Sequence, residues 1–359
     1  MMGVHPTRGS ASGWLGAVAT WLTADWFGFG RRPEPDEAAS PVASVLGRMS
    51  AALLRLLGGA TALFTLTGFL GRFWWAFDIT SHFRAQYLAG AVVLAVAQAL
   101  CRRWRWTGFA VALAAVNAAV LAPHTGLFPT ATVPSPADAP SIRAVLLNVR
   151  TDNREFGRVR DFLRETRPNF AVLEEIDAVW QRELEPLRDL FPHTLAEPRG
   201  DNFGIMLLSR HPLAGARVVQ LGDTGVPSVF ARVTIGGKEL TVLGTHPLPP
   251  GGREYSDHRN RQLVEIARFL AAQSGPLVLL GDLNTTPWNF HFQRLLADSG
   301  LRSSAAGRGY QASWPATPFY LRIPIDHCLL SPELRVLRRA IGPAVGSDHL
   351  PVVVDFALP

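Results

Sequence analysis

Three apolar runs follow one another in the first third of the chain, at 51–71, 86–101 and 106–123. The first and the third reach the roughly 17–25 residues that a helix needs to cross a bilayer, and Phe83 and Tyr87 could extend the second at the interface. A buried helical core is the weaker alternative, because the runs leave no polar face. A cleaved signal peptide fits poorly, since the first run begins near residue 51. We therefore expect about three transmembrane helices over 51–123, with the lipid bilayer as a partner.

The loop between the second and third runs predicts the orientation of these helices. It reads CRRWRW, and its three arginines Arg102, Arg103 and Arg105 favour the cytoplasmic side. Residues 1–50 would then form a cytoplasmic or interfacial segment, in which 13–30 could lie along the membrane surface or span it. The chain after the third run would emerge outside. This predicts a multi-pass protein of the inner (cytoplasmic) membrane with an extracytoplasmic C-terminal part.

A Pro-rich stretch at 124–140 separates the apolar part from the rest and predicts an extended linker. Residues 1–140 carry ten Lys and Arg against six Asp and Glu, and residues 141–359 carry twenty-five against twenty-three. The net charge of the second part is therefore only +2. A charge this small argues against tight binding of duplex nucleic acid, which depends on dense cationic surfaces.

Residues 141–359 have the pattern of one mixed α/β domain. Strands are predicted at 142–149, 170–176, 204–209, 229–235, 239–246, 276–283, 325–331 and 352–358, and helices at about 155–166 and 256–273. The short turn IGGKE at 235–239 indicates an antiparallel hairpin. Many strands and few helices favour two sheets packed face to face with helices outside.

Polar residues stand at the ends of six of these strands, where a strand does not need them. Singly, each of these residues is typical of a turn. Together they would converge on one cleft. They are Asn148, Glu174, Glu175, His246, Asp282, Asn284, Asp326, His327, Ser347, Asp348 and His349.

The motifs TH at 245–246, GDLN at 281–284, IDH at 325–327 and GSDHLP at 346–351, with Asn148 and Glu175 upstream, resemble the endonuclease/exonuclease/phosphatase superfamily. The phrases VRTDNREF at 149–156, LPP at 248–250, LNTTPW at 283–288 and RIPIDH at 322–327 are similar to a bacterial YafD-like subgroup with N-terminal membrane helices. The resemblance implies a four-layered α/β sandwich like that of deoxyribonuclease I, and divalent-metal hydrolysis of phosphoesters.

The resemblance also implies a metal site. Glu175 would be the central ligand, with Asn148 beside it and Asp348 near the ion. Oxygen ligands of this kind favour Mg²⁺ or Mn²⁺ over zinc. Some relatives carry an Asp at the position of Arg150, and the arginine in this sequence casts doubt on a second metal position, which leaves the number of metals open.

The remaining motif residues take the catalytic roles of the family. Asp282 would orient or deprotonate the attacking water, and Asn284 would hold that water or a phosphate oxygen. His349 would contact the phosphate, with Asp326 fixing its tautomer. His246 would act as an acid toward the leaving group.

Neighbouring residues have less defined expectations. Glu174 would support the metal site or point away from it, because adjacent strand residues face opposite ways. His327 is expected to pack. Asn202–Gly204 and Trp288 are expected to line the substrate cleft.

Three functions fit these features. The first is an outward-facing phosphodiesterase or phosphatase that acts on a phospholipid headgroup or another phosphoester near the membrane. The second is an extracytoplasmic endonuclease or exonuclease. The third is a membrane scaffold that keeps the fold without catalysis. The sequence indicates no protein partner.

Overall fold

The computed structural model describes residues 41–126 and 141–358. The segment 13–30 and most of the Pro-rich linker lie outside these residues. The chain divides into two compact units, Met1–Leu53 and Leu54–Pro359. The apolar helices from Leu54 onward and the α/β domain both belong to the second unit.

The apolar part folds into helices α2 (Pro41–Thr67), α3 (Trp75–Ser81), α4 (Arg84–Leu100) and α5 (Trp104–Leu121), with the 3-10 turns η1 (Gly68–Leu70) and η2 (Ala122–His124). Two stretches, Gly47–Leu70 and Trp104–His124, are long and apolar enough to cross a membrane. A third span is possible only if α3 and α4 count as one, and these two helices meet at a bend of 65°. The first helix begins ten residues earlier than the apolar run that predicted it.

A buried polar cluster joins three of these helices. The Arg84 guanidinium donates to the carbonyl of Thr65 at 2.7 Å, and the Asn117 amide donates to the Thr65 hydroxyl at 3.0 Å. Polar side chains between apolar helices act in this way as interhelical contacts. The cluster therefore fixes α2, α4 and α5 against one another at the end nearest α3.

The α/β domain contains two six-stranded sheets. The first has the order β11 (Arg335–Ile341), β12 (Val352–Ala357), β1 (Ser141–Asn148), β2 (Phe170–Glu174), β4 (Ile205–Ser209) and β3 (His193–Glu197). The second has the order β5 (Leu213–Gln220), β6 (Pro227–Ile235), β7 (Lys238–Thr245), β8 (Leu277–Asp282), β10 (Asp326–Leu330) and β9 (Arg302–Ser303). Each sheet has one parallel pair at its centre, β1 with β2 and β7 with β8.

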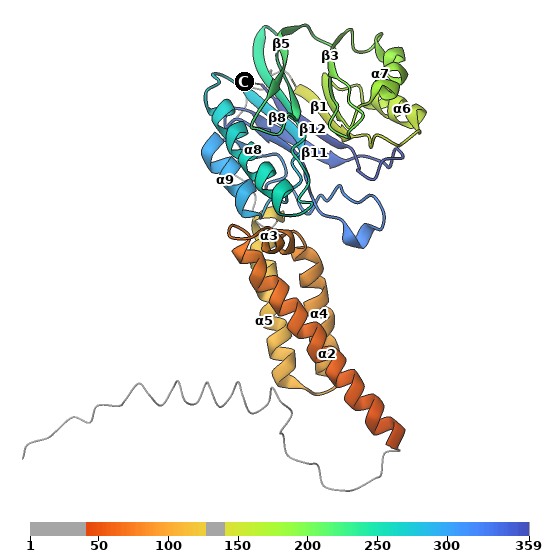
Figure 1. The fold of residues 1–359 in the computed structure, drawn as a ribbon, viewed down its shortest axis with the longest axis vertical. Helices are drawn as coiled ribbons and strands as arrows, with labels where there is room; N and C mark the ends of the chain where they lie inside the picture. Colours follow the sequence, from red (N-terminus) through yellow and green to blue (C-terminus); the bar gives the residue numbers. More distant parts are fainter. Residues whose placement is uncertain (1–40, 127–140, 359) are drawn as a thin grey trace, which may run out of the picture. The chain divides into compact units, whose positions relative to one another are not determined.

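The two sheets pack face to face and helices cover both outer faces (Figure 1). Helices α6 (Phe156–Thr166) and α7 (Ala178–Glu183), with η3 (Glu185–Leu187), cover the first sheet, while α8 (Arg253–Ala271) and α9 (Phe290–Ser299) cover the second. Apolar side chains such as Leu146, Val172 and Leu280 fill the space between the sheets. The expected four-layered sandwich is therefore confirmed.

All eight predicted strands and both predicted helices are present, and the 235–239 turn joins β6 and β7 as an antiparallel hairpin. The sequence missed β3, β5, β9, β11, α7 and α9. Strands β3, β5, β9 and β11 lie at or next to the sheet edges, where half-exposed side chains break the apolar pattern. Helix α7 has only six residues, too few for a periodic signal.

Candidate active site

Strand alternation carries the polar motif residues to one end of the space between the sheets. In β1, Ile142, Ala144 and Leu146 face the inter-sheet core, so Asn148 two residues later faces the same way. Asp282 continues the series of Val278 and Leu280 in the same manner. The carboxyl ends of the central parallel strands lie at this end, so these residues meet where the apolar core stops.

Asn148 and Glu175 form the first half of the site. The Asn148 amide donates to Glu175 Oε1 at 2.8 Å, and the backbone N–H of Thr151 donates to Oε2 at 3.1 Å. Burial raises the pKa of Glu175 despite these two bonds, and the charge of Asp348 raises it further. Glu175 has a left-handed backbone with φ of +60°, a strained conformation that commonly occurs at functional sites.

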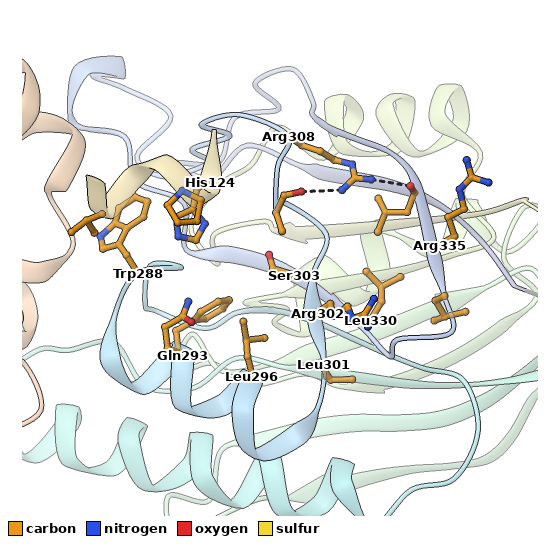
Figure 2. A pocket seen from close by; sticks show the side chains of 16 residues that line it. His124, Trp288, Gln293, Leu296, Leu301, Arg302, Ser303, Arg308, Leu330 and Arg335 are labelled. Carbon is orange, nitrogen blue, oxygen red and sulfur yellow. Dashed lines mark hydrogen bonds between the residues drawn. The ribbon is translucent and has the colours of Figure 1, made fainter. Parts of the chain in front are cut away.

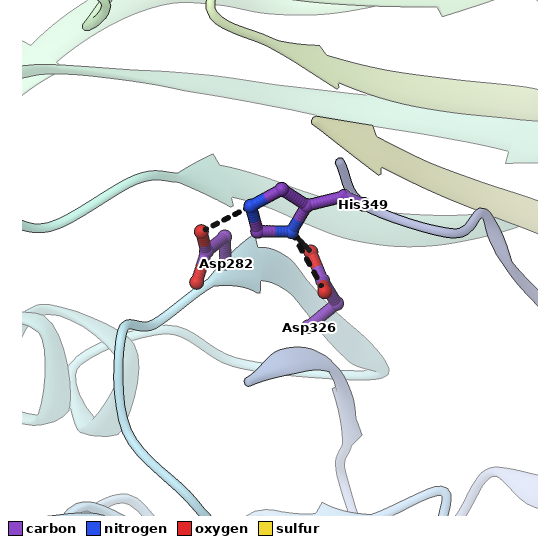
Figure 3. A group of neighbouring side chains, drawn as sticks. All are labelled: Asp282, Asp326 and His349. Carbon is purple, nitrogen blue, oxygen red and sulfur yellow. Dashed lines mark hydrogen bonds and ion pairs between the residues drawn. The ribbon is translucent and has the colours of Figure 1, made fainter. Parts of the chain in front are cut away.

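Asp282, His349 and Asp326 form the second half of the site (Figure 3). The His349 ring lies with Nδ1 3.0 Å from Asp326 Oδ2 and Nε2 3.6 Å from Asp282 Oδ2, and all three residues are buried. Burial alone would lower the pKa of His349, but the two carboxylates outweigh it and raise the pKa to about 10. His349 therefore carries a positive charge at neutral pH.

His246 lies beside Asp282 but differs from His349 in charge. Its Nε2 is 3.6 Å from Asp282 Oδ2, and its buried Nδ1 has no hydrogen-bond partner among the described residues. Burial and then the positive charge of His349 lower the pKa of His246 to about 3. A neutral imidazole is a poor proton donor, so His349 suits the role of acid better than His246, to which the sequence analysis assigned it.

The backbone after β8 brings Asn284 into the site. A Cβ on Gly281 would lie 2.0 Å from the carbonyl oxygen of Thr245, so only glycine fits this approach of β8 to β7. Asn284 has φ of +50°, and its backbone N–H donates to Asp282 Oδ1 at 2.9 Å. Its side-chain amide donates to the carbonyl of Pro247 at 2.9 Å.

Most of these residues line a cleft of about 590 Å³, and Asn148 and Asp326 lie behind its walls. The predicted site residues in its walls are Glu175, His246, Asp282, Asn284, Asp348 and His349. Asn202 and Phe203 line it as expected, whereas Gly204 does not. Trp288 does not. It lines a separate cavity of about 620 Å³, shown in Figure 2, with His124, Arg302 and Arg308 and with no carboxylate in its walls. Trp288, which was expected to line the substrate cleft, therefore lies outside its walls.

The donor set around Glu175 fits a divalent cation. Glu175 and Asp348 bring carboxylate oxygens to the same cleft, and the charge of Asp348 disfavours ionisation of Glu175, so a cation there would neutralise both groups. Asp282, Asp326 and His349 also offer atoms within 4.8 Å of one another. Because a carboxylate already faces each nitrogen of the protonated His349 ring, we assign the ion to the Glu175 side. Asn148 Oδ1 accepts a bond from the N–H of Arg150, and its ligand role remains a prediction.

Two contributors to the site were not assigned from the sequence. The carboxylate of Glu174 accepts the backbone N–H of Asp282 at 3.1 Å and so links the two sheets beneath the site. Burial and the neighbouring carboxylates raise its pKa. The Trp314 indole donates to Asp348 Oδ2 at 3.0 Å. Only the position of Glu174 at the end of β2 gave a signal, and its partner Asp282 is 108 residues away.

A family model described as the Endonuclease/Exonuclease/phosphatase family matches residues 145–349. The chain belongs to this family. It is therefore a metal-dependent hydrolase of phosphoesters. Enzymes of this family use divalent metals, generally Mg²⁺ or Mn²⁺. A search among curated proteins found no match.

Solved structures have the same fold. An endonuclease/exonuclease/phosphatase from Beutenbergia cavernae DSM 12333 is 23% identical with a TM-score of 0.50, covering 61% of this chain and 72% of that one. D. rerio TDP2 complexed with a single-strand DNA product is 15% identical with a TM-score of 0.51, covering 61% and 99%. The human Nocturnin catalytic domain with bound sulfate is 17% identical with a TM-score of 0.51, covering 62% and 96%.

The arrangement supports phosphoester hydrolysis by the residues of this chain. Burial, opposed by the charge of His349, raises the pKa of Asp282, and a carboxylate with a raised pKa is a suitable proton acceptor for an attacking water. His349 holds a positive charge 3.6 Å from Asp282 and can stabilise negative charge on a phosphoryl oxygen. When bound near Glu175, a divalent metal polarises the phosphoryl group as a Lewis acid.

Proposed function

We propose that the protein is a membrane-anchored, outward-facing phosphodiesterase or phosphatase that acts on a phosphoester in the headgroup of a membrane lipid. One observation carries this proposal. The cleft that holds Glu175 and Asp282 is also lined by Ile79, His82 and Phe83. These three residues lie in α3 and in the short link to α4, so part of the cleft wall comes from the candidate membrane helices.

An exposed apolar turn on the same side supports this proposal. Phe319 and Tyr320 in η4 (Phe319–Leu321) are 74% and 64% exposed. The Gln86 amide at the start of α4 donates to the carbonyls of Tyr320 and Arg322 at 3.3 and 3.0 Å. Exposed aromatic side chains beside the end of a membrane helix are typical of the headgroup region. A lipid headgroup would therefore lie close to the cleft.

The basic turn between α4 and α5 supports the outward orientation. This turn contains Arg102, Arg103 and Arg105 and lies at the ends of α4 and α5 that are remote from the catalytic domain. Helix α4 has 17 residues and is therefore about 25 Å long, and the contacts of Gln86 lie at its other end. Under the positive-inside rule this turn faces the cytoplasm and the cleft faces outward. Membership of the YafD-like subgroup is part of the same proposal.

Substrate choice tests the lipid assignment. Full-length protein in nanodiscs with Mg²⁺ is assayed on phospholipid vesicles, bis-p-nitrophenyl phosphate, plasmid DNA and RNA. We expect Phe83→Ala to lower kcat/KM on vesicle lipid by about ten-fold while turnover of the soluble diester stays within about two-fold, because the substitution removes apolar contact area. Leu337→Ala, at a half-exposed position in β11, is the control and should change neither rate.

A preference for DNA or RNA over vesicle lipid would replace the lipid assignment by the nuclease alternative. The weak net charge of residues 141–359 argues against that outcome. If the wild type turns over no substrate faster than the Asp282→Ala variant does, the non-catalytic scaffold remains as the function of the protein. The orientation is tested separately with a reporter fused after Pro359, which should be active only outside the cytoplasm. Cytoplasmic activity of the reporter would overturn the orientation and leave the chemistry untouched.

A further inference from the structure

The segment Asp282–Asn289 contacts two different parts of the molecule. Its first residues, Asp282 and Asn284, line the catalytic cleft. Its last residues contact α3, a helix that belongs to the apolar part of the chain. The segment thus connects the active site to α3.

Four hydrogen bonds attach the end of this segment to α3 and to the residue after it. The Asn289 amide donates to Asp78 Oδ1 at 2.6 Å and to the Ser81 hydroxyl at 2.9 Å. The Trp288 indole donates to the carbonyl of Ser81 at 2.7 Å, and His82 Nδ1 lies 3.1 Å from the Thr286 hydroxyl. Because Asn289 also caps α9 by accepting the N–H of His291, the contact fixes the start of that helix too.

A fully buried ion pair lies at the centre of this contact. Arg259 Nη2 in α8 is 2.5 Å from Asp78 Oδ2, and both side chains are 0% exposed. Two charges removed from water gain little net stability, because desolvation offsets their attraction. Such a pair is better explained by the geometry that it imposes than by the stability that it adds.

Arg259 transmits this geometry to the active site. Its Nη1 donates to the backbone carbonyl of Asn284 at 2.8 Å. Asn284 has a left-handed backbone, and its own N–H donates to Asp282 Oδ1. A strained residue keeps its conformation only where its surroundings fix it from several sides. The contacts therefore form a continuous series from Asp78 through Arg259 and Asn284 to Asp282.

We propose that Asp78 is a positioning residue for the active site: by holding Arg259, it fixes the Asn284 backbone and so the orientation of the Asp282 carboxylate. The inference rests on the catalytic assignment of Asp282 and Asn284 made above, and not on the lipid substrate. It implies that the apolar helices complete the catalytic segment. A fragment of residues 141–359 would leave Arg259 and Asn289 without their partner.

Removing the charge of Asp78 in the full-length protein tests this proposal. The variant is Asp78→Asn, and the matched control is Asp355→Asn. The control removes the carboxylate that pairs with Arg143 at 2.6 Å. This pair lies at the start of β1, away from the cleft. Turnover of bis-p-nitrophenyl phosphate with Mg²⁺ and the Tm are measured for both. We expect Asp78→Asn to lower kcat by about ten-fold to a hundred-fold with KM within about two-fold, because a misplaced catalytic group slows the chemical step. Asp355→Asn should lower only the Tm.

Two results would overturn the proposal. In one, Asp78→Asn keeps kcat within about two-fold of the wild type while its Tm falls, which would make the pair a docking contact only. In the other, Asp355→Asn loses kcat to the same extent. If Asp78→Asn does not fold, Arg259→Lys replaces it. Lysine keeps the positive charge but lacks the planar fork that reaches both Asp78 and Asn284, so the same loss of kcat is expected and a normal kcat would refute the proposal.

Hydrogen exchange makes the test independent of turnover. The peptide covering 282–289 should exchange faster in Asp78→Asn than in the wild type and in Asp355→Asn, because Asn284 loses its restraint. Unchanged exchange would contradict the proposal even if kcat falls. If the wild type hydrolyses no phosphoester, the proposed function fails, and the exchange measurement still decides the role of Asp78.

Discussion

The two ends of the segment Asp282–Asn289 lie in buried clusters of charge that are balanced differently. At the catalytic end, Asp282 and Asp326 face one cation, His349, and the buried Glu174 carboxylate accepts the backbone N–H of Asp282. At the other end Asp78 pairs with Arg259, and Asn289 donates to its other carboxylate oxygen. The first cluster has more carboxyl groups than cations, whereas the second pairs one carboxylate with one guanidinium.

This difference separates groups that react from groups that position. Excess carboxylate in the first cluster raises the pKa values of Asp282 and Glu174, chiefly through burial and mutual repulsion. Groups with shifted pKa values can exchange protons at neutral pH. Asp78 and Arg259 do not exchange protons in this way, because each charge stabilises the other. This pair therefore suits a fixed contact beside a reactive one.

The largest effect is expected from removing the metal, because the Lewis acid that would polarise the phosphoryl group is then lost. Full-length protein treated with EDTA should lose turnover of bis-p-nitrophenyl phosphate entirely and regain it with Mg²⁺ or Mn²⁺. The Tm should fall on chelation, because a ligand at a hundred times its Kd stabilises the folded state by about 2.7 kcal/mol. Unchanged turnover in EDTA, checked by metal analysis, would contradict the assignment of a metal to Glu175.

The next largest effect is expected from Asp282→Ala, which removes the carboxylate that accepts the proton. We expect kcat to fall by about 10²- to 10⁴-fold, the range for loss of a general base. Asp298→Ala removes an exposed carboxylate that pairs with Arg294 in α9, outside the cleft, and serves as the control. A loss smaller than about ten-fold in Asp282→Ala would move the role of base to another residue.

The two histidines of the cleft should differ in the same assay. His349 is charged at neutral pH because its pKa is raised to about 10, whereas His246 is neutral because its pKa is lowered to about 3. We expect His349→Asn to lower kcat by about 10²-fold and His246→Asn by about ten-fold. His258→Asn, at a contact with Asp223 outside the cleft, is the control and should leave kcat unchanged. A larger loss in His246→Asn would restore the acid role that the sequence suggested for it.

The catalytic cluster could be predicted from the sequence, because its signals are local. Polar residues at the ends of apolar strands, such as Asn148 and Asp282, stand out within a few positions of their own strands. The parallel pairs β1–β2 and β7–β8 then bring these strand ends together. Strand β5 escaped prediction for the opposite reason, since most of its side chains are exposed and carry no periodic signal.

The positioning pair could not be predicted, because its partners are 181 residues apart and each has an ordinary local context. One cue was present. Arg259 precedes Leu263, Ile266 and Leu270 at helical spacing, so a charged residue occupies the buried face of α8. Nothing in the sequence showed that its partner would come from the apolar helices. Trp288 was misassigned for the same reason, since its partner Ser81 lies in α3.

The smallest effect is expected in stability, from Asp282→Asn in EDTA. Burial raises the pKa of Asp282 in the folded state above its ordinary value of 3.8, which applies to the unfolded state. At any pH between 3.8 and the raised pKa, the folded state therefore binds more protons than the unfolded state. The free energy of unfolding contributed by this group therefore decreases as pH rises through that window. An asparagine at this position does not ionise, so it avoids this pH-dependent loss of stability, and it keeps an acceptor oxygen for the N–H of Asn284. We expect the Tm to rise by about 2–4 °C per kcal/mol gained, with a larger gain at pH 8 than at pH 5.

Asp78→Asn should instead lower the Tm at both pH values, because it leaves the Arg259 charge buried without its partner. A Tm of Asp282→Asn that falls, or that rises equally at both pH values, would show that the ionised Asp282 carboxylate does not destabilise the folded state.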